Sequence, residues 1–230
     1  MTILALRLAG PLQSWGAASR FVRRSTEPAP TKSGVLGLIA AAQGRRRTDA
    51  IEDLLALNFG VRIDQPGRVV RDFQTAVPDV GKPLPLSYRY YLGDAVFLAL
   101  LEADRQLLEG IEDALRNPTF PLYLGRRSCP PVGPLSLGLR ELNLSTALST
   151  EPWQASPWYQ RTHPTAASWL ATVVDCKPTD EGSETVRDKP LSFDPRRREY
   201  GWRSVLRDHV SLIAESAALP AGFHDPMTAF

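Results

Sequence analysis

The segment from Ala95 to Glu102, AVFLALLE, constrains the fold of this 230-residue chain more than any other part of the sequence. It is an almost continuous apolar run whose only charged residue stands at its end. Strands buried on both faces have such runs, whereas strands with one face in water alternate apolar and polar residues. The sequence therefore predicts a central strand at 95–102 that is buried on both faces.

Other periodic segments surround this strand in a recognisable order. Thr31 or Ser33 can cap a helix that ends at Gly44, and Asp104 can cap a second helix that Asn117 and the following proline stop. The predicted elements are a strand at 2–10, a helix at 31–44, strands at 59–63, 67–77 and 95–102, a helix at 104–118 and a strand at 134–142. This order fits an α+β fold with a ferredoxin-like (RRM-like) core over residues 1–145.

Two parts of the chain lie outside that minimal unit. Residues 72–94 join two strands through a proline-rich, aromatic and polar connection, and connections of this length are usually functional or flexible. Residues 146–230 are rich in Ser, Thr, Pro and Trp, with strand-like pieces at 168–176 and 201–206 and a polar loop at 177–190. We expect residues 146–230 to form a β-rich C-terminal annex packed on the core.

The charge is unevenly distributed. The net charge is +2, yet residues 1–50 hold eight arginines and lysines against two acids, so the remaining residues carry −4. A basic segment in a near-neutral chain suggests a surface that faces a polyanion. A solvated surface with a random excess of arginine is the alternative.

The sequence carries no signal for a membrane or for secretion. No apolar run approaches the roughly 18 residues that a membrane span needs, and MTILALRLAG lacks the basic start and cleavage site of a signal peptide. Cys129 and Cys176 form neither a metal-ligand pattern nor a disulfide framework. We expect a cytoplasmic protein with two reduced thiols and no membrane contact.

No catalytic arrangement is apparent. His163, His209 and His224 have no metal-ligand spacing, and neither a G-x-S-x-G elbow nor a G-x-x-x-x-G-K-[ST] phosphate loop is present. Cys129 lies near Arg127, which can lower the pKa of a thiol, but prolines follow it and we assign it to packing. We expect a protein that is not an enzyme, with no catalytic residue, metal or cofactor.

Four segments occur together and in order: LRLAGPLQSWG, PTKSGVLGLIAAAQG, LGDAVFLALL and FPLYLGRRSCPPVGPL. They resemble the CasD family of Cascade subunits, the subtype I-E members of the fifth CRISPR-associated family. RDFQT and VRDKPLSFDPRRREYGWRSV fit more loosely. The resemblance spans roughly residues 4–206 and is poor over 145–185.

The resemblance implies a non-catalytic RNA-binding subunit of a crRNA-guided surveillance complex. Such a subunit holds the 5′ handle of the guide RNA and caps the helical backbone of the complex. The resemblance also implies a long β-hairpin thumb, which falls on residues 72–94, with Gln74, Thr75 and Arg89 as RNA contacts. The implied partners are crRNA, CasC-like backbone subunits, a CasA-like large subunit and target DNA within the complex.

Two short segments are candidate phosphate-binding sites. Arg126 and Arg127 present two guanidinium groups in a turn bordered by prolines, and we hypothesise that they clamp the RNA backbone. A structural ion pair is the alternative. Lys32 and Ser33 stand at a helix start whose free N–H groups form an anion site, unless they only cap the helix.

Weaker candidates lie nearby. Arg20, Arg23 and Arg24 form either a basic patch or a solvated surface. Trp15 can stack on a base, but we favour an anchor in the core. The arginines at 45–47 follow the first helix, where cations complement the helix dipole, so a structural role is at least as good as a functional one.

The alternative function is a metal-independent endoribonuclease that processes CRISPR repeat RNA. Relatives in another CRISPR subtype cut with a Tyr/Lys/His group near the core sheet. Here no histidine precedes His163, and Lys82 is the only lysine between Lys32 and Lys177. We therefore expect cutting to fall to a separate subunit. A generic RNA-binding module outside CRISPR is the second alternative.

Overall fold

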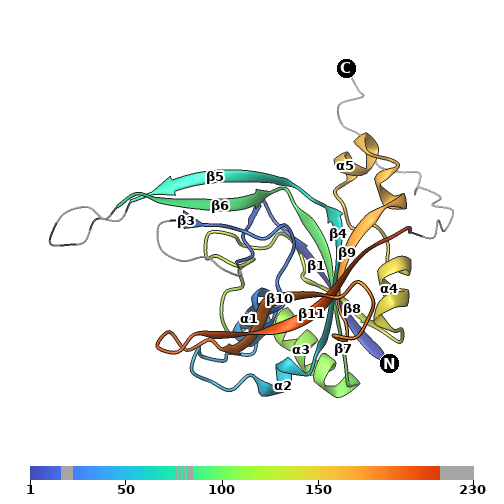
Figure 1. The fold of residues 1–230 in the computed structure, drawn as a ribbon, viewed down its shortest axis with the longest axis horizontal. Coiled ribbons are helices and arrows are strands. Elements are labelled where there is room, and N and C mark those ends of the chain that lie inside the picture. The colour runs from blue at the N-terminus through green and yellow to red at the C-terminus, as the bar shows by residue number, and fades with distance from the viewer. Residues whose placement is uncertain (17–22, 76, 78, 80, 82–84, 213–230) are drawn as a thin grey trace.

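The computed structural model describes residues 1–16, 23–75, 77, 79, 81 and 85–212 (Figure 1). Its main feature is a seven-stranded antiparallel sheet in the order β10-β11-β9-β4-β7-β1-β8. The strands are β1 (Thr2–Ala9), β4 (Asn58–Gln65), β7 (Val96–Ala103), β8 (Ser136–Arg140), β9 (Leu170–Asp175), β10 (Glu184–Ser192) and β11 (Glu199–Val210). The prediction of an α+β fold is confirmed in this form, a mixed structure built on a large antiparallel sheet.

Strand β7 is the central strand that the apolar run predicts. It pairs with β1 on one side and β4 on the other. Phe97 and Leu101 belong to the core that includes the first and third helices, whereas Leu98 and Leu100 belong to a second core on the opposite face. Because each face of β7 meets its own core, nearly every side chain of the strand is apolar.

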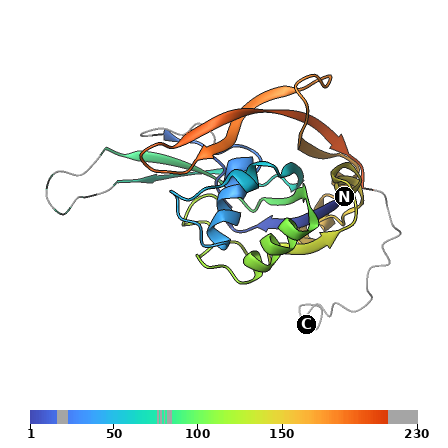
Figure 2. The same ribbon diagram turned by 90° about the horizontal axis from the view of Figure 1, so that it is seen from below.

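The helices cover both faces of the sheet. Helices α1 (Lys32–Ala42) and α3 (Arg105–Arg116) pack together on one face, with α2 (Glu52–Leu55) beside them, and α4 (Leu144–Thr150) packs on β4 and β7 on the other (Figure 2). Thr31 and Asp104 cap α1 and α3 through their side chains, as predicted. The helix α5 (Pro157–Thr162) and the 3₁₀ helix η1 (Ala166–Ser168) follow. Among the described residues, no helix is long and apolar enough to cross a membrane.

A second, smaller sheet contains the projecting hairpin. It consists of β2 (Leu12–Gln13), β3 (Arg23–Arg24), β5 (Arg68–Gln74) and β6 (Ser87–Gly93). Strands β5 and β6 form an antiparallel hairpin that extends away from the main sheet (Figure 1). Its strands include residues 72–74 and 87–93 of the predicted thumb at 72–94, and the first strand begins earlier, at Arg68.

The C-terminal strands extend the main sheet. Strand β9 pairs with β4, and β11 pairs with β9, so the region after residue 146 continues the sheet of the first 145 residues. The predicted polar loop at 177–190 is wrong from Glu184 onward, where β10 begins. Strand β10 lies at the edge of the sheet, and its pairing with β11 is interrupted twice. Exposure and irregular pairing together leave β10 without a clear apolar alternation.

Candidate nucleic-acid interface

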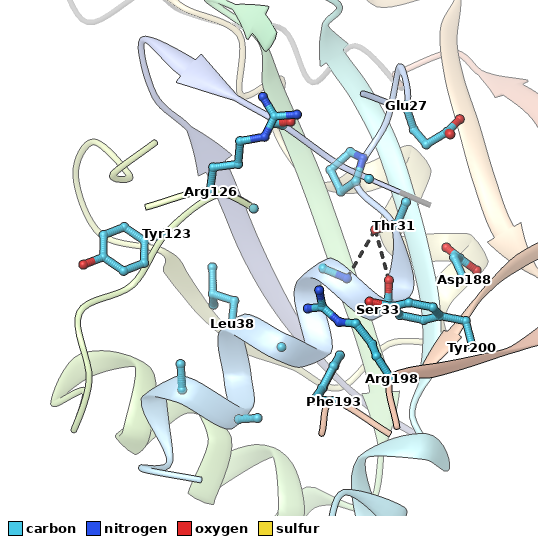
Figure 3. A pocket seen from close by; sticks show the side chains of 18 of the residues that line it. Glu27, Thr31, Ser33, Leu38, Tyr123, Arg126, Asp188, Phe193, Arg198 and Tyr200 are labelled. Atoms are coloured by element: carbon cyan, nitrogen blue, oxygen red, sulfur yellow. Dashed lines mark hydrogen bonds between the residues drawn. The ribbon is translucent and has the colours of Figure 1, made fainter. Parts of the chain in front are cut away.

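A wide cleft of about 1670 Å³ lies where α1, the loop at 120–127 and the β10–β11 hairpin meet. Tyr123 and Arg126 lie on one side of α1, and Arg198 and Tyr200 lie on the other (Figure 3). The arginines that line the cleft are Arg24, Arg45, Arg46, Arg47, Arg126, Arg127, Arg187, Arg198, Arg203 and Arg207. Only three acids stand among the described lining residues, Glu27, Asp188 and Glu199. The cleft therefore has a strong excess of positive charge.

The start of α1 binds a carboxylate of the protein itself, that of Asp188. The backbone N–H of Lys32 donates to Asp188 Oδ2 at 2.8 Å. The Lys32 ammonium donates to Leu57 O and to Asp175 Oδ2, both at 2.7 Å, and Lys32 is only 6% exposed. Because its donors are used inside the protein, we leave Lys32 out of the RNA-binding set. Ser33 is buried too, with its Oγ 3.4 Å from Thr31 Oγ1, although it lines the cleft.

A buried ionic cluster joins the C-terminal hairpin to α1. Arg203 on β11 donates to Asp188 Oδ1 at 2.5 Å and Oδ2 at 2.9 Å, and to Asp175 Oδ1 at 2.5 Å. Burial alone lowers the pKa of the Arg203 guanidinium, but Asp188 and Asp175 more than offset this, and the net pKa is raised. The charged form of Arg203 therefore links β9, β10 and the start of α1.

The adjacent arginines of the 120–127 loop have different roles. Arg126 is half-buried and donates to Tyr90 O at 3.2 Å and Arg24 O at 3.0 Å, while its guanidinium lies 4.7 Å from the centre of the Tyr91 ring. It ties the loop to β3 and β6. Arg127 is exposed and lines the cleft. The hypothesis of a paired clamp is therefore revised: Arg126 holds the loop in place, and Arg127 has its guanidinium available to a ligand.

The backbone of this loop depends on Gly125. Gly125 has φ +92°, and a Cβ at this position would collide with the carbonyl oxygen of Ser14. Ser14 N in turn donates to Leu124 O at 3.0 Å. The loop is thus fastened to the segment after β1, which presents Arg127 from a rigid support.

The other predicted residues are spread over the small sheet. Arg24 is exposed and lines the cleft, and the Arg23 guanidinium lies 5.4 Å from the centre of the Tyr90 ring. Arg20 lies outside the described residues. Trp15 is fully buried and donates to Gln13 Oε1 at 3.1 Å, so its role as an anchor is confirmed.

The three thumb residues do not line the cleft. Gln74 and Thr75 are exposed on the ascending side of the hairpin, and Gln74 donates to Asp72 Oδ2 at 2.9 Å. Arg89 is half-buried on β6 between its ladder partners Asp72 and Arg24, and its buried Nε has no hydrogen-bond partner. The structure therefore separates the predicted residues into a cleft group and a hairpin group.

Sequence reasoning missed the wall of the cleft formed by the β10–β11 hairpin. Arg187, Arg198, Tyr200, Trp202 and Arg207 line it. The signal was present in the run PRRREYGWR, which combines arginines with aromatic residues. Its proximity to α1 could not be read from the sequence, because the two segments are more than 150 residues apart.

Cys129 is packed in the core, as predicted. It is fully buried beneath the arginine loop, and burial raises the pKa of its thiol.

Together, the excess of guanidinium groups and the aromatic side chains make the cleft suitable for a polyanion with flat, stackable parts. These are the properties of nucleic-acid-binding proteins. The sequence profile of the family described as CRISPR-associated protein (Cas_Cas5) matches residues 3–206. The chain belongs to this family.

Comparisons with known relatives agree with this family assignment. The chain is 38% identical over 157 residues to the CRISPR system Cascade subunit CasD of Escherichia coli (strain K12), which covers 59% of this chain and 70% of the relative. A structure described as a crystal structure of a Cas protein superposes with a TM-score of 0.70 at 40% identity, covering 91% of this chain and 95% of the other. A chain of a CRISPR RNA-guided surveillance complex superposes with a TM-score of 0.74 at 31% identity, covering 91% and 90%.

Proposed function

We propose that this chain is a non-catalytic crRNA-binding subunit of a type I-E Cascade complex, in which it holds the 5′ handle of the guide RNA and caps the backbone filament. The observation that carries the proposal is the arginine-lined cleft. Its volume of about 1670 Å³ exceeds the roughly 300–1,000 Å³ typical of small-molecule pockets. A flexible chain of phosphates fits such a surface better than a single small ligand does.

The fold supports the same proposal. The strands β4-β7-β1-β8 are neighbours, and α1 and α3 are inserted between them in the chain order of a ferredoxin-like core. The β5–β6 hairpin is the proposed thumb, with Gln74, Thr75 and Arg89 as its RNA contacts. The proposed partners are crRNA, CasC-like backbone subunits, a CasA-like large subunit and target DNA, all in the cytoplasm.

Within the cleft, we assign the phosphate contacts to exposed arginines from separate segments. These are Arg24 from β3, Arg46 and Arg47 after α1, Arg127 from the loop and Arg198 before β11. Arg126 positions the loop. Because the five exposed arginines come from distant parts of the sequence, the binding surface exists only in the folded chain.

The test measures the affinity of the full-length protein for single-stranded RNA with the handle sequence at several salt concentrations. Each lost phosphate contact to a single strand removes about 0.7 from the slope of log affinity against log salt concentration. The triple variant R46A/R127A/R198A is expected to bind less tightly, with a slope reduced by about 2. Arg161→Ala is the control, because Arg161 is exposed on α5 and does not line the cleft. An unchanged slope in the triple variant contradicts the proposal.

The non-catalytic part of the proposal has its own test. His163 stacks on Tyr159 with ring centres 4.2 Å apart, and His209 stacks on Trp169 at 4.5 Å; neither histidine lines the cleft. Incubation with CRISPR repeat RNA in the absence of metal is expected to leave the RNA intact. Cleavage that releases a handle supports the endoribonuclease instead.

A further inference from the structure

The two walls of the cleft differ in chemistry. The wall formed by α1 and the 120–127 loop presents small side chains, arginines and the aromatic rings of Phe120 and Tyr123. The wall formed by the β10–β11 hairpin pairs its arginines with aromatic rings. The Arg187 guanidinium lies 5.9 Å from the centre of the Trp202 ring, and the Arg198 guanidinium lies 5.9 Å from that of Tyr200. On the opposite wall Arg126 lies over the Tyr91 ring, but Tyr91 does not line the cleft, so the paired rings that face the cleft belong to the hairpin wall.

The aromatic ring of Trp202 is exposed to solvent within the cleft. Its side chain is 64% exposed and lines a cleft that is already formed in the folded chain. A large aromatic ring gains free energy by burial, so an exposed ring in a preformed cleft offers a ligand a flat apolar surface. Arg187 lies beside the ring and donates from Nε to Tyr200 O at 3.1 Å, which holds its side chain in place. The hairpin wall therefore combines a stacking surface with a fixed positive charge.

We propose that the β10–β11 hairpin is the base-binding wall of the cleft, and that an unpaired base of a single-stranded RNA stacks on Trp202 while Arg187 and Arg207 contact the adjacent phosphates. This inference rests on the proposed function and adds the chemical state of the ligand, a single strand with accessible bases. A duplex cannot present the faces of its bases to Trp202, because those faces are stacked inside the helix. The cleft therefore selects single-stranded RNA over double-stranded RNA.

The anchorage of the hairpin supports this role. Arg203, the neighbour of Trp202, is fixed to Asp188 and Asp175, and Phe193 packs against Gly37 of α1, where a Cβ would meet its ring at 3.5 Å. The stacking surface is thus held at a set distance from the opposite wall. A single strand between the two walls can stack a base on Trp202 while its phosphates contact arginines of both walls.

The chain provides a matched control. Trp169 is 71% exposed and also lies in the C-terminal region, but it stacks on His209 and does not line the cleft. Trp202→Ala and Trp169→Ala therefore remove equivalent exposed rings, only one of which faces the proposed ligand. Because both rings are exposed, both variants are expected to fold, and thermal unfolding checks this.

The experiment measures the affinity of the full-length protein for two single-stranded RNAs of equal length, one with the handle sequence and one unrelated. Stacking of one base contributes about 1–3 kcal/mol, so Trp202→Ala is expected to weaken binding about 5- to 150-fold. Trp202→Phe should retain most of the affinity, and Trp169→Ala should match the wild type. Trp202→Ala should leave the salt slope unchanged, because a base contact releases no counterion, whereas Arg187→Ala should lower the slope by about 0.7.

Abasic substitution along the handle RNA identifies the stacked base. One position is expected to lose affinity in the wild type and to cause no further loss in Trp202→Ala. The inference is overturned if Trp202→Ala binds within twofold of the wild type, or if every abasic position weakens both proteins equally. Equal wild-type affinity for the two RNAs, with the loss in Trp202→Ala preserved, overturns handle recognition and leaves the stacking wall intact.

Discussion

The buried cluster around Arg203 allows a quantitative test of how the cleft is assembled. Arg203→Ala removes a guanidinium that is 8% exposed and makes three hydrogen bonds to Asp188 and Asp175. Hydrogen bonds to charged groups contribute about 1.5–3 kcal/mol each, so three independent bonds would total about 4.5–9 kcal/mol. Lys32 remains in place for both carboxylates, because its N–H donates to Asp188 and its ammonium to Asp175.

This remaining compensation reduces the expected loss to about 3–5 kcal/mol, the range found when one partner of a buried ion pair is removed. Urea denaturation followed by circular dichroism measures the loss, and hydrogen exchange in β10 and β11 shows where it arises. Arg207→Ala is the control on the same strand. Arg207 and Glu184 are 47% and 55% exposed, so their ion pair contributes about 0–1 kcal/mol. Similar losses in the two variants would refute the idea that the buried cluster fastens the hairpin to α1.

Four further outcomes are expected. Gly125→Ala should destabilise the protein by more than about 2 kcal/mol in urea denaturation, because the added Cβ would collide with Ser14. Gly133→Ala is the control: Gly133 has φ +75° and open space around it, so its loss should be only about 1–2 kcal/mol. Equal losses in the two variants would contradict this reasoning. Iodoacetamide should modify native Cys129 far more slowly than Cys176, because the Cys129 thiol is fully buried and Cys176 is only half-buried; equal rates at pH 8 would contradict this. Burial raises the pKa of the Cys129 thiol, so the folded state favours the neutral thiol. The contribution of this thiol to the free energy of unfolding is therefore complete below about pH 8.5 and is lost as the pH rises through the folded-state pKa. Replacing residues 75–86 by a short turn should leave the fold intact by circular dichroism and impair assembly with the proposed backbone subunits. Unfolding of this variant would contradict the assignment of the segment to a projecting thumb.

Much of the fold could be predicted because its signals are local. The apolar run of β7, the Thr31 cap of α1 and the Asp104 cap of α3 each depend on a few neighbouring residues. Strand β10 was missed because its stability comes from pairing with β11 at the edge of the sheet. Edge strands in contact with water need no apolar pattern, so periodicity does not reveal them.

The candidate site was less predictable, because its roles depend on distant partners. From the sequence, Lys32 at a helix start is a candidate phosphate ligand. In the folded chain its backbone N–H donates to Asp188 and its ammonium donates to Asp175, both far along the chain. Arg126 and Arg127 are neighbours in sequence, and only the position of Tyr90 and Arg24 separates a fixed arginine from an exposed one.

By itself, the sequence determined the central strand β7 and the helices α1 and α3, since apolar spacing and capping act within a few residues. It also determined the family, whose motifs are continuous stretches of chain. Only the tertiary structure decided which arginines face the cleft and which are used up in buried contacts. The physical reason is that a guanidinium or ammonium group binds whichever oxygen lies nearest, and folding brings that oxygen from a part of the chain that local pattern does not reach.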